Sequence, residues 1–327
     1  MKKNPQLQKL LSELTNSPEY NKLALGVSGG TDSVAMFLLM LNKTRIEGKE
    51  MCVFHVDHSL RLSSPSDKNF VQELCEKHSV EFYSETAKES DKAELKTLGT
   101  EAWARKFRYE SFAKMLSLSN ADLLATGHNA NDQAETLLMR MLAGTSWQGL
   151  RGIPEEALLK TAYGSVRVWR PLLKISRPEL EDLLKSEAIP HVEDETNISD
   201  VYLRNRIRHE LLPLMEEISP GASRMIMALG EDAALIQDEL AVKAEKYLSA
   251  NCDKESGRLK INRKTETSLR REILRSWFTE FLPDVRINRK LIERADELWM
   301  SEIRGRKITH RDFSIVTDRK FLTLQKI

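Results

Sequence analysis

The stretch LALGVSGGTDSVAMFLLM, residues 23–40, decides how the rest of the chain is interpreted. Its first apolar run, Leu23–Val27, predicts a buried strand, and the run Val34–Met40 predicts a helix. The glycine-rich connection Ser28–Ser33 joins them. Such a loop presents bare backbone N–H groups and the positive end of a helix at the carboxyl edge of a sheet, where phosphates bind. The sequence therefore predicts a phosphate-binding loop at Ser28–Ser33.

Asp32 sets this loop apart from two common phosphate-binding patterns. No lysine follows the glycines, so the pattern G-x-x-x-x-G-K-S/T is absent, and G-x-G-x-x-G is absent as well. A carboxylate at this position would repel phosphate unless a cation lies between them. Mg²⁺ favours one or two carboxylates together with substrate phosphates, so Asp32 is a predicted Mg²⁺ ligand. The alternative is an ordinary glycine turn with Asp32 complementing the positive helix start.

Length and composition indicate a folded protein of about two domains. The chain has 327 residues, of which 41% are hydrophobic and 30% charged. Residues 201–327 hold 25 Lys+Arg and 20 Asp+Glu, which is compatible with a polyanionic partner or with a solvated surface.

Three widely spaced cysteines favour a reducing compartment. With no long apolar run and no apolar stretch near the amino terminus, we expect a cytoplasmic protein without membrane contact.

Apolar segments rich in β-branched residues alternate with helical segments over the first two-thirds of the chain. This alternation predicts an α/β fold, a parallel sheet with helices on both faces. The expected strands are Lys22–Val27, Met51–Val56, Val80–Ser84, Asp122–Thr126 and Val166–Trp169, and the expected helices are 32–43, 65–78, 100–118, 131–143 and 177–187. The pattern changes near Ser219–Gly221, which predicts domains of residues 1–218 and 219–327. The second is expected to be smaller and mainly helical (224–250, 265–281, 287–303), with a hairpin of 313–316 and 321–324.

Other polar motifs follow the predicted strands and helices. In a helix, Glu101, Arg105 and Arg108 share one face, so two guanidiniums can clamp phosphates there, or the three can form an exposed ion-paired face. His128 and Asp132 frame a helix start after the fourth strand, at the edge where ligands of open α/β folds bind. Asp132 can share a metal site with Asp32, act as a base, or only complement the helix dipole.

Arg204 and Arg208 share a helix face in the same way, and they can contact phosphates of a ligand or belong to a solvated surface. His55, Asp57 and His58 lie at the end of the second strand. Alternate strand residues point to opposite faces, so we expect structural roles for them rather than a shared metal site.

The loop SGGTDS resembles the SGGxDS loop of the PP-loop ATP pyrophosphatases, whose fold is adenine nucleotide alpha hydrolase-like. Four further segments, in the same order, resemble motifs of the tRNA(Ile)-lysidine synthetases. They are Phe54–Arg61, Glu101–Tyr109, Thr126–Arg140 and Asp194–Arg208. The chain departs from that family at Asn131, Ala143 and Ser146, where Asp, Arg and Gly are usual.

The resemblance implies an enzyme that uses ATP and Mg²⁺ to ligate L-lysine to C2 of the wobble cytidine (position 34) in the CAU anticodon of tRNA(Ile). Asp32, Arg108, His128 and Asp132 are then the expected catalytic residues, with Asp32 and Asp132 as metal ligands. Arg204 and Arg208 are expected to contact tRNA, with residues 219–327 as a tRNA-binding domain and a homodimer possible. The expected ATP-binding residues are Ser28, Gly29, Gly30, Thr31, Asp32, Ser33, Arg105, Arg108 and Arg204.

Three other functions share parts of this pattern. A tRNA thiolase commonly uses paired cysteines, and no Cys-x-x-Cys is present. Ammonia-using synthetases of this superfamily commonly depend on a glutaminase partner and lack a basic tail. A tRNA-binding protein without activity would not need the complete SGGTDS loop.

Overall fold

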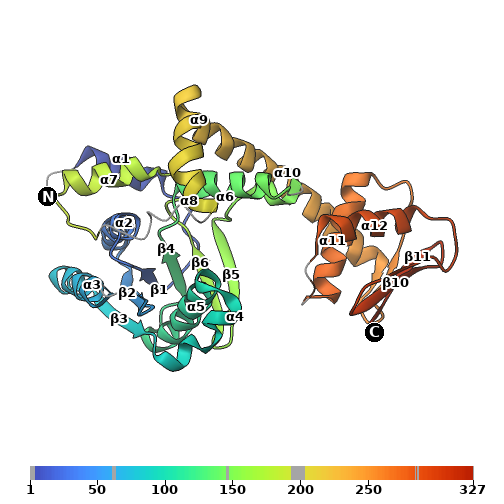
Figure 1. Ribbon diagram of the computed structural model, residues 1–327, viewed down its shortest axis with the longest axis horizontal. Helices are drawn as coiled ribbons and strands as arrows, with labels where there is room; N and C mark the ends of the chain where they lie inside the picture. The colour runs from blue at the N-terminus through green and yellow to red at the C-terminus, as the bar shows by residue number, and fades with distance from the viewer. Residues whose placement is uncertain are drawn as a thin grey trace. The chain divides into compact units, whose positions relative to one another are not determined.

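The computed structural model describes residues 4–60, 64–144, 147–192, 203–283, 285 and 287–326. Contacts within the chain divide it into two compact units (Figure 1). The first comprises Met1–Met139 with Ile153–Met227, and the second Arg140–Gly152 with Ala228–Ile327. The domain boundary expected between residues 218 and 219 stays a prediction.

The first unit is built on a six-stranded sheet of order β3-β2-β1-β4-β6-β5. All neighbours run parallel except β5 and β6, which form an antiparallel pair. The bounds are β1 (Lys22–Gly26), β2 (Glu50–Asp57), β3 (Glu81–Thr86), β4 (Leu123–Thr126), β5 (Glu156–Thr161) and β6 (Gly164–Trp169). The expected α/β fold is therefore confirmed, and each expected strand is present. β5 was not predicted, because this edge strand alternates between exposed and half-buried residues and carries charge at Glu156 and Lys160.

Helices cover both faces of this sheet. On one face α1 (Pro5–Glu13), α2 (Thr31–Glu47), α3 (Ser64–His78) and α7 (Arg177–Ser186) share a core with the strands. On the other face, α5 (Thr100–Ser119) packs on the strands through Tyr109, Phe112 and Met115. α2 is buried on nearly all sides, which explains its unbroken apolar run. The remaining helical segments are η1 (Glu89–Glu94), α4 (Leu95–Leu98), α6 (Ala130–Leu142), α8 (Leu203–Arg206), the π-helical turn η4 (Ile207–Leu211) and α9 (Leu212–Ile218).

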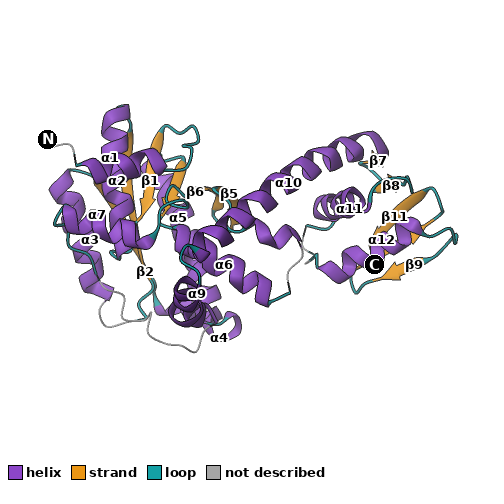
Figure 2. Cartoon of the chain, turned by 90° about the horizontal axis from the view of Figure 1, so that it is seen from above, coloured by secondary structure: helices purple, strands orange, loops and turns teal. Residues whose placement is uncertain are grey.

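The second unit combines three helices with a five-stranded antiparallel sheet of order β7-β8-β11-β10-β9 (Figure 2). The expected hairpin is confirmed as β10 (Phe313–Thr317) and β11 (Phe321–Lys326). The other strands, β7 (Cys252–Asp253), β8 (Arg258–Lys260) and β9 (Lys307–Thr309), are too short to show an alternating pattern in the sequence. The helices are α10 (Ala222–Asn251), which begins in the first unit, α11 (Thr267–Phe281) and α12 (Arg289–Met300). η2 (Trp147–Arg151) also belongs to this unit.

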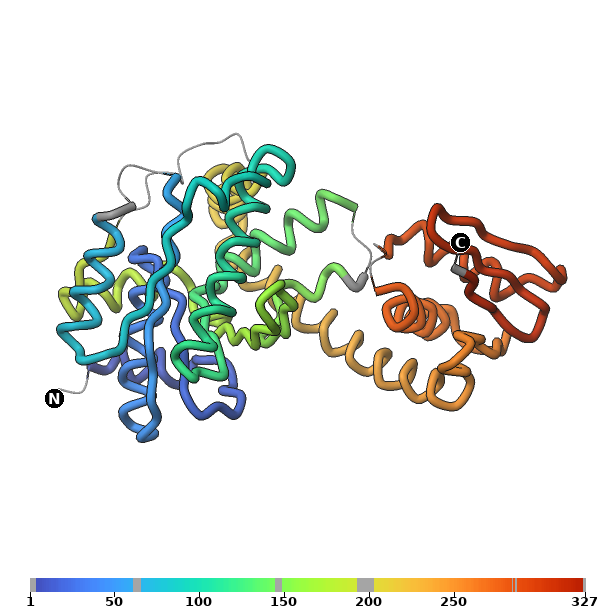
Figure 3. The backbone as a smooth tube through the Cα atoms, turned by 90° about the horizontal axis from the view of Figure 1, so that it is seen from below, coloured from blue at the N-terminus to red at the C-terminus, as the bar shows by residue number. Residues whose placement is uncertain are grey.

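The core of the second unit lies between its helices and one face of its sheet. Trp277 and Phe278 of α11, Trp299 of α12 and Phe313 of β10 are fully buried there. Figure 3 traces this unit from α10 in orange to β11 in red. Among the described residues, no helix combines the length and the apolar character needed to cross a membrane.

Candidate active site

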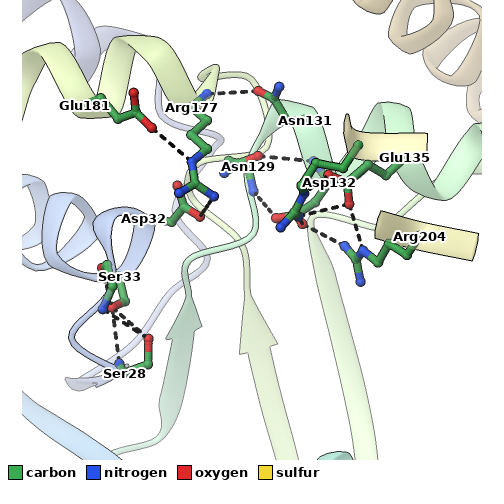
Figure 4. Close-up of polar contacts among 12 residues, drawn as sticks. Ser28, Asp32, Ser33, Asn129, Asn131, Asp132, Glu135, Arg177, Glu181 and Arg204 are labelled. Carbon is green, nitrogen blue, oxygen red and sulfur yellow. Dashed lines mark hydrogen bonds and ion pairs between the residues drawn. The ribbon is translucent and has the colours of Figure 1, made fainter. Parts of the chain in front are cut away.

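The loop Ser28–Ser33 follows β1 and leads into α2, as the sequence predicts (Figure 4). Ser33 Oγ accepts hydrogen bonds from the backbone N–H groups of Ser28 and Gly29, both at 3.2 Å, and donates to Gly30 O at 2.9 Å. Gly30 caps α2 without a side-chain hydrogen bond. Ser33 thus stabilises the loop through hydrogen bonds within it. The first N–H groups of α2 have no hydrogen-bond partner within the helix. This arrangement is suited to an anion.

The carboxyl end of β4 packs directly against the start of α2. A Cβ atom on Gly127 would lie 3.3 Å from the backbone carbonyl carbon and oxygen of Asp32 and from Ser33 N. Only glycine allows this approach without displacing backbone atoms. The loop Ser28–Ser33 and the His128 segment therefore meet at one edge of the sheet, as the parallel arrangement of β1 and β4 requires.

Asp32 has one carboxylate oxygen without a hydrogen-bond partner among the described residues. Its Oδ2 lies 4.0 Å from Arg177 Nη1, whereas Oδ1 is buried and unpartnered. Burial raises the pKa of Asp32, and the nearby Arg177 guanidinium opposes that shift. An unpartnered carboxylate oxygen beside a phosphate-binding loop fits a Mg²⁺ ligand. Because the described residues contain no cluster of three or more His, Cys, Asp and Glu side chains, phosphate and water would complete the coordination.

Asp132 and Glu135 of α6 hold two arginines from the segment that begins with α8. Asp132 Oδ1 accepts from Arg204 Nη2 at 2.7 Å and from Arg208 Nη2 at 3.5 Å. Glu135 is fully buried and accepts from Arg204 Nε at 2.7 Å and from Arg208 Nε at 2.5 Å. The two arginines lie on one helix face, as their spacing predicts, and that face contacts carboxylates within the protein. The metal, base, ATP and tRNA roles expected of these residues stay predictions.

The start of α6 is fixed by a reciprocal pair of hydrogen bonds. Asp132 Oδ2 accepts from Asn129 N at 3.0 Å, and Asn129 Oδ1 accepts from Asp132 N at 3.1 Å. Asp132 therefore does complement this helix start, which was one of the alternatives. Its second oxygen remains directed at the arginines, so the carboxylate serves both α6 and the site.

His128 is a neutral imidazole surrounded by guanidinium groups. Its Nδ1 lies 3.0 Å from Thr126 Oγ1. Burial lowers the pKa of His128 to about 3, and the positive charges of Arg170, Arg204, Arg105 and Arg108 lower it in the same direction. Arg105 and Arg108 come from the exposed face of α5, where Arg105 lies over the Tyr109 ring at 5.0 Å. Because these four arginines surround the uncharged His128 side chain, the region is better suited to a polyanionic ligand than to a neutral one.

Two arginines of this region were not predicted. Arg170 follows β6, is buried, and donates through Nη1 to Pro154 O at 2.7 Å. Arg177 begins α7 and bonds Glu181 through Nε at 3.1 Å while facing Asp32. Their only sequence signal is position, directly after a strand and directly after the helix-capping Ser176.

The departure at Asn131 has a structural role, because its Oδ1 accepts from Arg177 N at 2.9 Å and so caps α7. Ala143 is exposed after α6. Ser146 and the motif residues from Asp194 to Tyr202 lie outside the described residues.

His55 takes the structural role expected of it, since its Nδ1 lies 2.9 Å from Val27 O and joins the end of β2 to the loop after β1. His58 Nε2 similarly lies 3.0 Å from Ala104 O of α5. Asp57 Oδ1 accepts from Ser59 N at 2.7 Å.

The fold and the loop define an α/β nucleotide-binding protein, and comparison with known families agrees. The PP-loop domain family matches residues 3–215. A tRNA(Ile)-lysidine synthase of Nostoc is 32% identical over 284 residues, covering 80% of this chain and 79% of the relative. The chain therefore belongs to the PP-loop family and, within it, to the tRNA(Ile)-lysidine synthase family.

Two further relatives carry the same name. One from Petrotoga mobilis is 29% identical over 302 residues, covering 91% of this chain and 92% of the relative. One from Enterococcus faecalis is 31% identical over 230 residues, covering 70% of this chain but only 48% of that relative, so the chain spans about half its length. A solved U34-tRNA thiolase from Methanococcus maripaludis has a TM-score of 0.58 at 21% identity, covering 70% of this chain and 77% of that one, which shows a shared fold.

Proposed function

We propose that this chain ligates L-lysine to C2 of the wobble cytidine of a tRNA(Ile) with a CAU anticodon, consuming ATP and releasing AMP and pyrophosphate. The product, lysidine, would redirect decoding from AUG to AUA in the cytoplasm. Family membership supports the reaction. The observation that carries the proposal for this chain is the loop Ser28–Ser33. Hydrogen bonds to Ser33 Oγ stabilise this loop, and the unpartnered oxygen of Asp32 lies beside it.

The nucleotide would bind with its pyrophosphate portion against the loop Ser28–Ser33 and the N-terminus of α2. Arg105 and Arg108 are exposed on one face of α5 and would hold phosphate oxygens in the bidentate manner that guanidinium groups favour. Mg²⁺ held by Asp32, with Asp132 as the second expected ligand, would neutralise part of the triphosphate charge. The arginine guanidiniums would supply the rest of the positive charge that faces the triphosphate, and they do so whether or not a metal is bound.

In the first step the cytidine O2 attacks the α-phosphorus of ATP. A bond between O2 and the α-phosphorus forms, and the bond from the α-phosphorus to the oxygen that leaves with pyrophosphate breaks. C2 then carries AMP, through O2, as a leaving group. Negative charge is concentrated on the α-phosphate oxygens in this transition state. The neutral His128 would donate a hydrogen bond there through Nε2, and Arg108 would supply the full charge.

In the second step the ε-amine of lysine attacks C2. The carbon–nitrogen bond forms, the bond from C2 to the AMP oxygen breaks, and the nitrogen gives up a proton. Asp132 is the proposed base for that proton. To accept it, the carboxylate must be less strongly paired with Arg204 and Arg208 than it is here, which would follow if both arginines turned to tRNA or ATP phosphates. Exclusion of water would protect the adenylated intermediate from hydrolysis.

The proposal is tested by combining the protein, Mg-ATP, labelled lysine and a tRNA(Ile) transcript with the CAU anticodon. We expect lysine incorporation, AMP and pyrophosphate in equal amounts. A tRNA(Met) transcript with the same anticodon measures selectivity. Glu210→Gln is a suitable control variant, because Glu210 of η4 forms an exposed ion pair with Arg206 of α8. Label in tRNA without ATP consumption, or AMP release that does not require lysine, would contradict the proposal.

A further inference from the structure

The end of the chain carries an excess of positive charge that the active site does not use. Residues 251–327 hold 19 Lys+Arg and 12 Asp+Glu, a balance of +7, so the preceding 250 residues have a balance of −6. These residues belong to the second unit, and they include its sheet, α11 and α12. A positively charged region in a protein whose other residues have a net negative charge favours a polyanionic partner.

The second sheet has one covered face and one outer face. Leu259, Ile308, Ile315 and Leu322 alternate into the core shared with the helices. By the register of the strands, their neighbours point to the opposite side, where Lys260 pairs with Phe321 and Lys307 with Val316. We call this the outer face, made up of Arg258, Lys260, Lys307, Thr309, Ser314, Val316, Phe321, Thr323 and Gln325. Both lysines, Arg258 and Thr309 are exposed, and the two apolar residues are half-buried.

The most distinctive feature of the outer face is an arginine fixed over an aromatic ring. The Arg258 guanidinium lies 4.0 Å from the centroid of the Phe321 ring, and its Nη2 donates to Asp318 Oδ2 at 2.6 Å. The side chain nevertheless remains 46% exposed. A planar cation that is already held in place loses little conformational freedom on binding. Guanidinium planes and aromatic rings on sheets are also the groups on which unpaired RNA bases stack.

We propose that the outer face of the second sheet is an RNA-contact surface, on which Lys260 and Lys307 bind phosphates and Arg258 with Phe321 stacks an unpaired base. The occupant is the tRNA substrate, so its identity rests on the proposed function. Charge complementarity and the exposed, preorganised guanidinium favour RNA over a protein partner, because a protein surface offers neither a regular phosphate array nor unstacked bases.

The surface is tested by equilibrium binding of the tRNA(Ile) transcript to the full-length protein between about 50 mM and about 200 mM salt. The variant Phe321→Leu keeps the apolar contact but removes the aromatic ring. The double variant Lys260→Ala, Lys307→Ala removes two phosphate contacts. Its matched control is Lys243→Ala, Lys290→Ala, which removes two exposed lysines from α10 and α12, on the helical side of the same unit. Thermal unfolding of each variant checks that the unit remains folded.

We expect Phe321→Leu to bind about ten-fold more weakly with an unchanged salt slope, since loss of one stacked base costs about that factor. The outer-face lysine pair should bind more weakly and lower the salt slope by about 1.5, whereas the control pair should match wild type. In steady state, KM for tRNA should rise in both outer-face variants while kcat stays constant.

Wild-type affinity and salt slope in both outer-face variants would overturn the inference. So would a changed oligomeric state of the outer-face variants with unchanged tRNA binding, because the face would then be a protein interface. Failure of the proposed function is a separate result. In that case wild-type protein would incorporate no lysine, whatever its affinity for tRNA.

Discussion

Removal of the Glu135 carboxylate is predicted to destabilise the segment around the candidate active site. Its side chain is fully buried and neutralises two guanidiniums, those of Arg204 and Arg208. The change Glu135→Gln keeps the shape but removes the charge. Among the described residues, Asp132 would remain as the carboxylate that contacts both arginines, at 2.7 Å and 3.5 Å from their Nη2 atoms. The segment from Leu203 to Leu211 would then lose its main attachment to α6.

The expected loss in the free energy of unfolding follows from the burial of the Glu135 side chain. Breaking a fully buried ion pair costs about 3 to 5 kcal/mol. Arg204 and Arg208 are 35% and 26% exposed, so solvent screens part of the interaction. We therefore expect a loss of about 2 kcal/mol in the free energy of unfolding. The matched variant Glu210→Gln removes a pair whose side chains are 61% and 52% exposed, and it should cost less than about 0.5 kcal/mol.

Thermal unfolding of the first unit measures this difference. For a unit of this size, about 2 kcal/mol corresponds to a fall in Tm of about 4 to 8 °C. Hydrogen exchange of amides in residues 203–218 should also accelerate in Glu135→Gln and not in Glu210→Gln. Equal Tm values for the two variants, with equal exchange rates in that segment, would refute the reasoning that a buried carboxylate fastens α8 to α6.

The remaining predictions concern the loop and His128. Asp32→Asn should lower the rate of pyrophosphate release at least about 100-fold. Its Tm should be unchanged or higher, because the variant removes a carboxylate whose pKa is raised by burial. A fall in Tm large enough to account for the lost turnover would contradict this prediction. His128 binds no proton near neutral pH, so single-turnover pyrophosphate release without lysine should show no titration between about pH 6 and about pH 8, and a step that His128→Gln abolishes would be incompatible with a neutral imidazole. The unfolded state protonates His128 below about pH 6.5 and the folded state does not, so stability should fall as pH drops from there towards about 3, and His128→Gln should reduce that slope in denaturant titrations. Gly127→Ala should weaken ATP binding at least about ten-fold, since its Cβ would meet the backbone of Asp32, whereas Gly144→Ala, in open space, should cost stability but keep ATP affinity in equilibrium titrations.

Much of the candidate site at the carboxyl edge of the first sheet could be predicted, because the sequence patterns that indicate it involve neighbouring residues. The apolar run before Ser28 requires a buried strand, the paired glycines require a loop, and the apolar run after Ser33 requires a helix, so the phosphate-binding loop follows from a few neighbouring residues. The faces of α5 and of the α8 segment follow in the same way from helical spacing. Edge strand β5 and the short strands β7, β8 and β9 have no such periodic signal and were not predicted.

The sequence by itself determined the class of fold, the loop at Ser28–Ser33, and the candidate residues for binding phosphate. Only the tertiary structure decided which of them meet. The strand order places β4 beside β1, so that Gly127 touches Asp32, and it brings Arg170 and Arg177 to the same edge from positions that have no motif of their own. It also decided that Asp132 and Glu135 face arginines. The physical reason is that backbone preference and hydrophobic periodicity act over a few residues, whereas ion pairing and burial depend on the packing of segments far apart in the chain.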